Sequence, residues 1–246
     1  TPEAIYGLSF GPWGPHDVAW MWGGDAWLPD HYTEHIAPRS LLDSSASIAG
    51  HQFWQDLAWK HHVTPRPGMD PTQGITFQNG RYGMVVAGGW NFWNYTTIKD
   101  FKWGVAALPR QASNKNSNYN DFWHLASYSK NVEATWTFMK YITSTEAQRA
   151  YSRLTGTPPT VKAAMDVWYQ RYEGLMAVAE LEKVTQGAIE PRRSVCSPAH
   201  HFVEYIPPIH VLYNTEIRDR ILRNEGSARD IIGKQKPQLD ALLSEI

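Results

Sequence analysis

The sequence predicts an α/β protein whose second half is rich in helices. Two observations support this fold class. Apolar runs typical of buried strands, at 82–89 and 101–109, are interleaved with segments of helical periodicity. After residue 131, helical patterns follow one another with short interruptions. The alternation alone leaves an α+β arrangement open as well.

The first half of the chain begins with an irregular aromatic segment and then a helix. Gly and Pro punctuate residues 10–30, which predicts loops. A helix is expected to start near Ser44 or Ser45, because either residue can cap it. Apolar residues then recur at every fourth position from Ala49 to Leu57, so this helix has one apolar face.

A change from strand to helix is expected at a double glycine. "YGMVVAGG", residues 82–89, predicts a buried strand, and "WNFWNYTTI", residues 90–98, predicts a short helix. Residues 101–109 and 121–129 predict further strands, separated by the polar loop 110–120.

Helices dominate from residue 131 onward. Segments 131–142, 144–154 and 163–186 each have helical periodicity. Thr143 and Glu146 have the spacing of a capping box, which predicts the start of the second of these helices.

The last part of the chain predicts two helices. The apolar residues of segment 208–223 recur at a spacing of four and are Ile209, Tyr213, Ile217 and Ile221. Ser227 and Asp230 have capping spacing for a final helix. Pro237 is expected to kink that helix or to mark its true start.

Composition excludes few functions. The formal net charge is −1 and no basic run occurs, so nothing favours nucleic acid as a partner. Cys196 is the only cysteine, which excludes an internal disulfide. The 12 Trp and 12 Tyr suit cores, interfaces and sugar rings alike.

Catalytic and metal motifs are missing from the sequence. It has no HExxH, CxxC, GxSxG or phosphate loop. The histidine pairs 61–62 and 200–201 are adjacent, so two such residues on a helix point about 100° apart and do not share a metal. Carboxylates are plentiful, but no local pattern selects a catalytic pair. The motifs therefore select no catalytic residues, and we expect no metal site.

Two tryptophans stand out from those at helical spacing. Trp54, Trp136 and Trp168 fit core positions of helices. Trp13 lies between two Gly-Pro pairs, and Trp90 follows Gly88-Gly89. Glycine leaves space beside a ring, so two partners remain open for these two rings: a ligand or the protein core. Trp93, one turn after Trp90, is expected to support the core.

The order of several motifs resembles the extracellular solute-binding proteins of carbohydrate ABC transporters, the maltose-binding-protein-like family 1. The stretch "FQNGRYGMVVAGGWNFWNYTTIKDFKWGVAALPRQ" is similar to the family's strand, its G-x-W corner and its following G-V-x-x-[LF]-P segment. "SKNVEATWTFMKYITSTEAQRAYSRLTGTPPT" is similar to its S-K-N-P-E helix, T-S-x-E-x-Q helix and T-G-x-x-P turn, with Val132 in place of the usual proline. The resemblance covers nearly the whole chain.

The resemblance implies the fold and function of a receptor. It implies a type II periplasmic-binding-protein-like α/β fold, of which this chain is mainly the C-terminal lobe. Such a receptor has no catalysis and no cofactor, binds a sugar between two lobes, and delivers it to a membrane permease. The implied location is extracytoplasmic, in the periplasm or on the outer face of the membrane, with a lipid anchor as one alternative.

The resemblance also implies ligand-binding residues. Gly89 and Trp90 match the G-x-W corner, whose tryptophan stacks on the sugar. Trp13 matches an aromatic platform in the first loop. The remaining ligand-binding assignments rest on looser matches and are Tyr213, Asp121, Trp123 and Arg193. For Arg193, a solvated loop arginine is an equal alternative.

The chain departs from the family in having no counterpart of the first lobe before Thr1. We expect residues 1–112 and 166–246 to form the C-terminal lobe and residues 113–165 to pack on the other lobe. Apolar helix faces of that segment, with Trp136 and Met139, are then exposed or covered by self-association. Half a cleft should bind sugar weakly.

Two other functions remain alternatives to a sugar receptor. One is a carbohydrate-active enzyme with aromatic subsites, which a turnover assay would reveal. The other is a helical interaction module whose aromatic residues all lie in its core.

Overall fold

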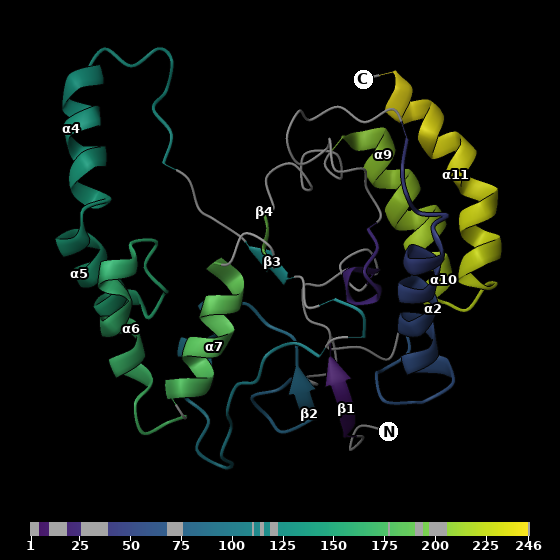
Figure 1. The fold of residues 1–246 in the computed structure, drawn as a ribbon, viewed down its shortest axis with the longest axis horizontal. Helices are drawn as coiled ribbons and strands as arrows, with labels where there is room; N and C mark the ends of the chain where they lie inside the picture. The colour runs from purple at the N-terminus through teal and green to yellow at the C-terminus, as the bar shows by residue number, and fades with distance from the viewer. Residues whose placement is uncertain are drawn as a thin grey trace. The chain divides into compact units, whose positions relative to one another are not determined.

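The computed structural model describes residues 5–9, 19–25, 39–67, 76–109, 111–113, 116–118, 123–176, 178–189, 194–196 and 206–245 (Figure 1). The chain divides into two compact units. Unit 1 comprises residues 1–86, 108–119 and 187–246, and unit 2 comprises residues 87–107 and 120–186.

Unit 1 contains two small parallel sheets. One is formed by β1 (Tyr6–Ser9) and β2 (Tyr82–Val85), the other by β3 (Asn116–Asn118) and β4 (Ser194–Cys196). The strand predicted at 82–89 is confirmed but shorter. The expectation that it is buried is wrong in part, because Met84 is exposed. In the register of this sheet, Tyr6 lies beside Tyr82 and Leu8 beside Met84.

The helices of unit 1 begin where the sequence places their caps. Helix α2 (Ser45–Trp59) is capped by Ser44, whose Oγ accepts a hydrogen bond from the Ser47 amide at 3.2 Å. Helix α11 (Ala228–Ser244) is capped by Ser227, whose Oγ accepts from the Asp230 amide at 3.1 Å. Since α11 runs through Pro237, that proline does not mark its start.

A π-helical segment explains the strict four-residue spacing of the apolar residues. Helix α9 (Pro207–Val211), the π-helix η6 (Leu212–Arg218) and α10 (Asp219–Leu222) follow one another without a break. On an α-helix, residues four apart drift by about 40° per step around the axis. The wider π turn reduces this drift, so one side of the segment stays in the core. Four residues on that side are buried: Ile209, Tyr213, Ile217 and Ile221.

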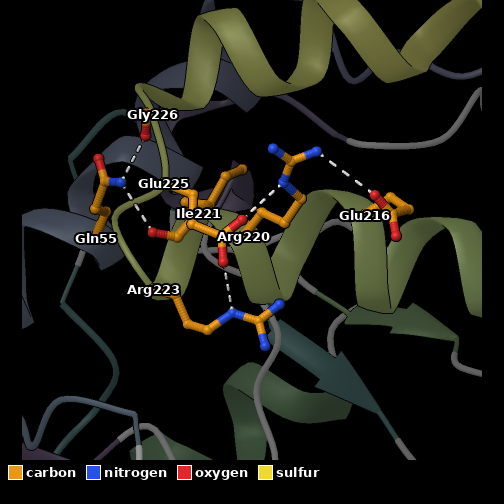
Figure 2. A network of polar contacts seen from close by, with 7 residues as sticks. All are labelled: Gln55, Glu216, Arg220, Ile221, Arg223, Glu225 and Gly226. Carbon is orange, nitrogen blue, oxygen red and sulfur yellow. Dashed lines mark hydrogen bonds and ion pairs between the residues drawn. The ribbon is translucent and has the colours of Figure 1, made fainter.

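The core of unit 1 lies between α2, the α9–α10 segment and α11, which run side by side in Figure 1. Gln55 of α2 fixes this packing, because its Nε2 donates to the carbonyls of Ile221 and Gly226, each at 2.8 Å (Figure 2). Around the same turn, Glu225 pairs with Arg220 and Arg223 at 2.9 and 3.0 Å. A short 3-10 helix, η1 (Trp20–Trp22), packs against α2.

Unit 2 is helical. Its elements are η4 (Gly89–Asn91), α3 (Phe92–Tyr95), α4 (Val132–Ile142), α5 (Thr145–Thr155), η5 (Lys162–Ala164) and α6 (Met165–Tyr172). Helix α7 (Val178–Ile189) begins in unit 2 and ends in unit 1. The long helix expected at 163–186 is therefore wrong. The chain turns between α6 and α7, where Gly174 has a φ of 82° that other residues rarely adopt.

Three further expectations for unit 2 differ from the structure. Ser144, not Thr143, caps α5, and its Oγ accepts from the Ala147 amide at 3.3 Å. Residues 101–109 and 123–129 form no strand. In the first of these segments, the Trp103 ring packs on other rings of unit 2, whereas Ala106 and Ala107 are exposed.

No residue of α4 is buried. Its exposed apolar side chains include Trp136, so the core position expected for that residue is wrong within unit 2. The assignment of residues 113–165 to the surface of another lobe stays a prediction. Among the described residues, no helix has the length and apolar character needed to cross a bilayer.

Candidate functional site

The corner after β2 carries the tryptophan that the sequence selects. The backbone leaves β2, is extended at Gly88 and then enters η4. The Asn91 amide donates to the Gly88 carbonyl at 2.9 Å, which closes this turn. Trp90 lies in the turn and is 42% exposed. The ring is thus presented at the surface rather than enclosed in the core.

Gly88 makes room for the Trp90 ring itself. A Cβ atom added at Gly88 would lie 2.3 Å from Cη2, Cζ2 and Cζ3 of Trp90. The six-membered part of the indole therefore lies directly over the Gly88 backbone. The sequence left a ligand or the core as the partner of this ring, but at Gly88 the ring itself occupies the space that the glycine leaves.

Gly89 faces the interior of unit 2. A Cβ atom there would meet Pro158 Cγ at 3.6 Å and Trp168 Cζ2 at 3.7 Å, which is ordinary van der Waals contact. The next turn, α3, directs Phe92 into the same interior. The Phe92 ring stacks on Trp168 with centroids 5.9 Å apart and an interplanar angle of 14°. The corner is therefore anchored on a buried aromatic core.

The aromatic core under the corner is held together by one backbone carbonyl. Gly156 ends α5 with a φ of 74°, and its carbonyl accepts two hydrogen bonds. Trp168 Nε1 donates at 2.9 Å and the Tyr172 hydroxyl donates at 3.0 Å. Both side chains are buried, which confirms the core position predicted for Trp168.

Burial perturbs the tyrosines of this core. Loss of solvent raises the pKa of the Tyr95 hydroxyl above its usual value. Burial also raises the pKa of Tyr172, although the nearby Arg171 charge opposes the shift. Both hydroxyls therefore stay protonated near neutral pH.

Trp93 departs from its expected role. The residue is 48% exposed, and its Cβ atom lies close to Gly156. The core position on this turn belongs to Phe92 instead. Trp90 and Trp93 are therefore both surface aromatic residues of one short corner, and the sequence spacing did not reveal this.

Two other predicted ligand residues have side-chain partners of their own. Trp123 is 57% exposed and packs edge-on against Phe138 of α4, with ring centroids 6.5 Å apart. Tyr213 is 1% exposed and belongs to the core of unit 1. Its hydroxyl lies 3.1 Å from Nε2 of the buried His51. Because Tyr213 offers no surface in this conformation, its ligand role rests on the resemblance alone.

The remaining predicted ligand residues lie outside the described residues; they are Trp13, Asp121 and Arg193. The structure brings together Gly89 and Trp90 in the corner. No group of His, Cys, Asp or Glu side chains suited to a metal ion occurs within the part of the chain that the structure describes.

Solved structures define the fold. An ABC transporter solute-binding protein from Thermotoga lettingae, bound to α-D-tagatose, shares 20% identity at a TM-score of 0.67, over 97% of this chain and 60% of that chain. The sugar-binding protein MalE from Xanthomonas citri shares 16% at 0.67, over 100% and 60%. UgpB from Mycobacterium tuberculosis, in complex with glycerophosphocholine, shares 15% at 0.64, over 100% and 58%.

The fold is that of the type II periplasmic binding proteins. The chain spans about 60% of the length of the first of these structures. No curated protein matches the chain at a significant level.

The sequence profile of the bacterial extracellular solute-binding proteins matches residues 9–177. This is more than half of the 246 residues, and the chain belongs to that family. The resemblance inferred from the sequence motifs is therefore confirmed. The family and the related structures are solute-binding proteins, which are not enzymes.

Proposed function

We propose that the chain is part of the substrate-binding component of an ABC importer for carbohydrates. The receptor lies outside the cytoplasm and binds its ligand by aromatic stacking and hydrogen bonds. Once loaded, it delivers the ligand to a membrane permease. The observation that carries this proposal is the Trp90 ring, exposed at a hydrogen-bonded corner in a member of a solute-binding family. Indole rings present a flat apolar face that suits the C–H faces of sugars.

The interactions that hold the corner in place favour a ligand-binding role for the Trp90 ring. The buried stack of Phe92 on Trp168 fixes the backbone of α3, and the hydrogen bond from Asn91 to Gly88 fixes the turn before it. A ring that is already held in place loses little conformational freedom when a ligand binds. We therefore assign Trp90 as the principal stacking residue.

The ligand class is a carbohydrate or a similar small polar solute. One of the related structures is bound to α-D-tagatose, another is described as a sugar-binding protein, and a third contains glycerophosphocholine. We propose a saccharide, because the exposed ring supplies an apolar face rather than a charge. Saturation-transfer NMR with tagatose, maltose and glycerophosphocholine tests this choice.

The expected result is saturation transfer to a saccharide that falls strongly in Trp90→Ala. Trp93→Ala is the matched control, since it removes an equally large and exposed ring from the same corner. No transfer to any saccharide, or equal transfer in both variants, would contradict the proposal. Turnover of an oligosaccharide in the same samples would instead support a carbohydrate-active enzyme.

We also propose that the apolar surface of α4 packs on a further lobe. Its exposed side chains include Trp136, Phe138 and Tyr141, and such surfaces mark interaction sites. A second copy of this chain is the alternative partner of this surface, and sedimentation of the chain alone tests for it. A dimer that Trp136→Glu dissociates would favour self-association, whereas a monomer supports the lobe.

A further inference from the structure

Only one of the two glycines at the corner is required by its surroundings. Gly88 has φ −75° and ψ 154°, a conformation open to any residue. Its lack of a side chain is therefore not explained by the backbone. The 2.3 Å distances from a Cβ atom there to three ring atoms of Trp90 do explain it. Real Cβ atoms do not approach other heavy atoms so closely, so any other residue at 88 displaces the ring.

Gly89 provides an internal comparison. A Cβ atom at Gly89 would meet Pro158 and Trp168 at 3.6 and 3.7 Å. An alanine therefore fits there without movement of its neighbours. The two glycines are adjacent and equally small, yet only the first one lies beneath the exposed ring.

We infer that Gly88 is a positioning residue for the stacking face of Trp90. This inference rests on the proposed function and identifies a determinant of affinity at the same site. The Gly88 backbone covers part of one face of the indole and holds the ring at a fixed height over the corner. A ligand then meets a ring whose orientation is set before binding.

The position of Gly88 is itself fixed. Its carbonyl accepts from the Asn91 amide at 2.9 Å, and the Gly89 carbonyl accepts from the Phe92 amide. Phe92 stacks on the buried Trp168. The surface on which the ring rests is thus connected to the aromatic core of unit 2. An added methyl group cannot be accommodated by a shift of this backbone alone, so the ring must move.

Fluorine NMR of the chain labelled with 5-fluorotryptophan tests the inference. The Trp90 resonance is assigned by its loss in Trp90→Phe. In Gly88→Ala that resonance should shift and become more sensitive to solvent, while in Gly89→Ala it should stay in place. An unchanged Trp90 resonance in Gly88→Ala would overturn the inference, whether or not the chain binds a ligand.

Maltose titration of the same samples tests the effect on affinity. Gly88→Ala should weaken binding by about tenfold, the scale of one lost aromatic contact. In a Trp90→Ala background, the Gly88→Ala substitution should have no further effect. A loss of affinity that persists without the ring would show a general structural effect and overturn the inference.

Two outcomes separate this inference from the proposed function. If the unsubstituted chain binds no saccharide, the proposed function fails and the effect on affinity fails with it. If it binds and Gly88→Ala binds equally well, only the inference fails. Should Gly88→Ala not fold, the double variant with Trp90→Ala should fold again, because the clash is removed; failure of that rescue would also contradict the inference.

Discussion

The carbonyl of Gly156 offers a direct test of how the corner is supported. It accepts from Trp168 Nε1 at 2.9 Å and from the Tyr172 hydroxyl at 3.0 Å. Gly156 and both side chains are buried. Trp168→Phe and Tyr172→Phe each remove one donor, and the double variant removes both. The two substitutions should therefore interact.

The expected magnitudes follow from the shared acceptor. Tyr172→Phe should lower the free energy of unfolding by about 0.5–1.5 kcal/mol, the net value of one hydrogen bond. Trp168→Phe should cost somewhat more, since the smaller ring also loses packing on Phe92. In the double variant the Gly156 carbonyl is left without either donor, which costs about 1–3 kcal/mol beyond a satisfied group. The loss of unfolding free energy in the double variant should thus exceed the summed losses of the two single variants by about 1–2 kcal/mol.

Urea unfolding followed by near-UV circular dichroism measures these free energies. Tyr213→Phe is the matched control, because its hydroxyl pairs with His51 in unit 1 and not with Gly156. Combined with Trp168→Phe, it should be additive within about 0.5 kcal/mol. Strict additivity of Trp168→Phe with Tyr172→Phe would refute the shared-acceptor account.

Two further predictions concern stability. Gln55→Leu should destabilise unit 1 by about 1–3 kcal/mol, because the Gly226 carbonyl loses its donor; Glu216→Ala, which removes a more exposed ion pair at 3.5 Å, should cost under about 1 kcal/mol in the same urea titration. The raised pKa of Tyr172 and Tyr95 predicts stability that is complete below about pH 10 and falls above it, because the unfolded tyrosines release protons first. Melting temperatures from pH 8 to 11 check this fall, which Tyr172→Phe should reduce; an unchanged slope would contradict the assignment.

Local signals in the sequence predicted much of the secondary structure. Ser44 and Ser227 cap α2 and α11 as expected, because a cap depends on a few adjacent residues. The four-residue spacing from Ile209 to Ile221 identified residues that share one face, and the structure shows that this face is buried. It did not identify the π-helix, because spacing reports which residues share a face and not how the backbone achieves it.

The site was harder to predict, because its geometry depends on the path of the backbone. Between Trp90 and Trp93 the chain changes from a 3-10 helix to an α-helix, so the angle per residue changes within one turn. Spacing alone therefore gave Trp93 a core role, whereas Phe92 takes the core position in the structure. Similarly, Tyr213 meets His51 across 162 positions of sequence, a contact that no local pattern contains.

The central claim is that the Trp90 ring binds a saccharide by stacking. Calorimetric titration of maltose or tagatose into the chain and its Trp90→Phe and Trp90→Leu variants measures this most directly. Trp90→Phe keeps an aromatic face and should retain most of the affinity, whereas Trp90→Leu should bind about tenfold more weakly. Equal dissociation constants for all three folded proteins would contradict the claim.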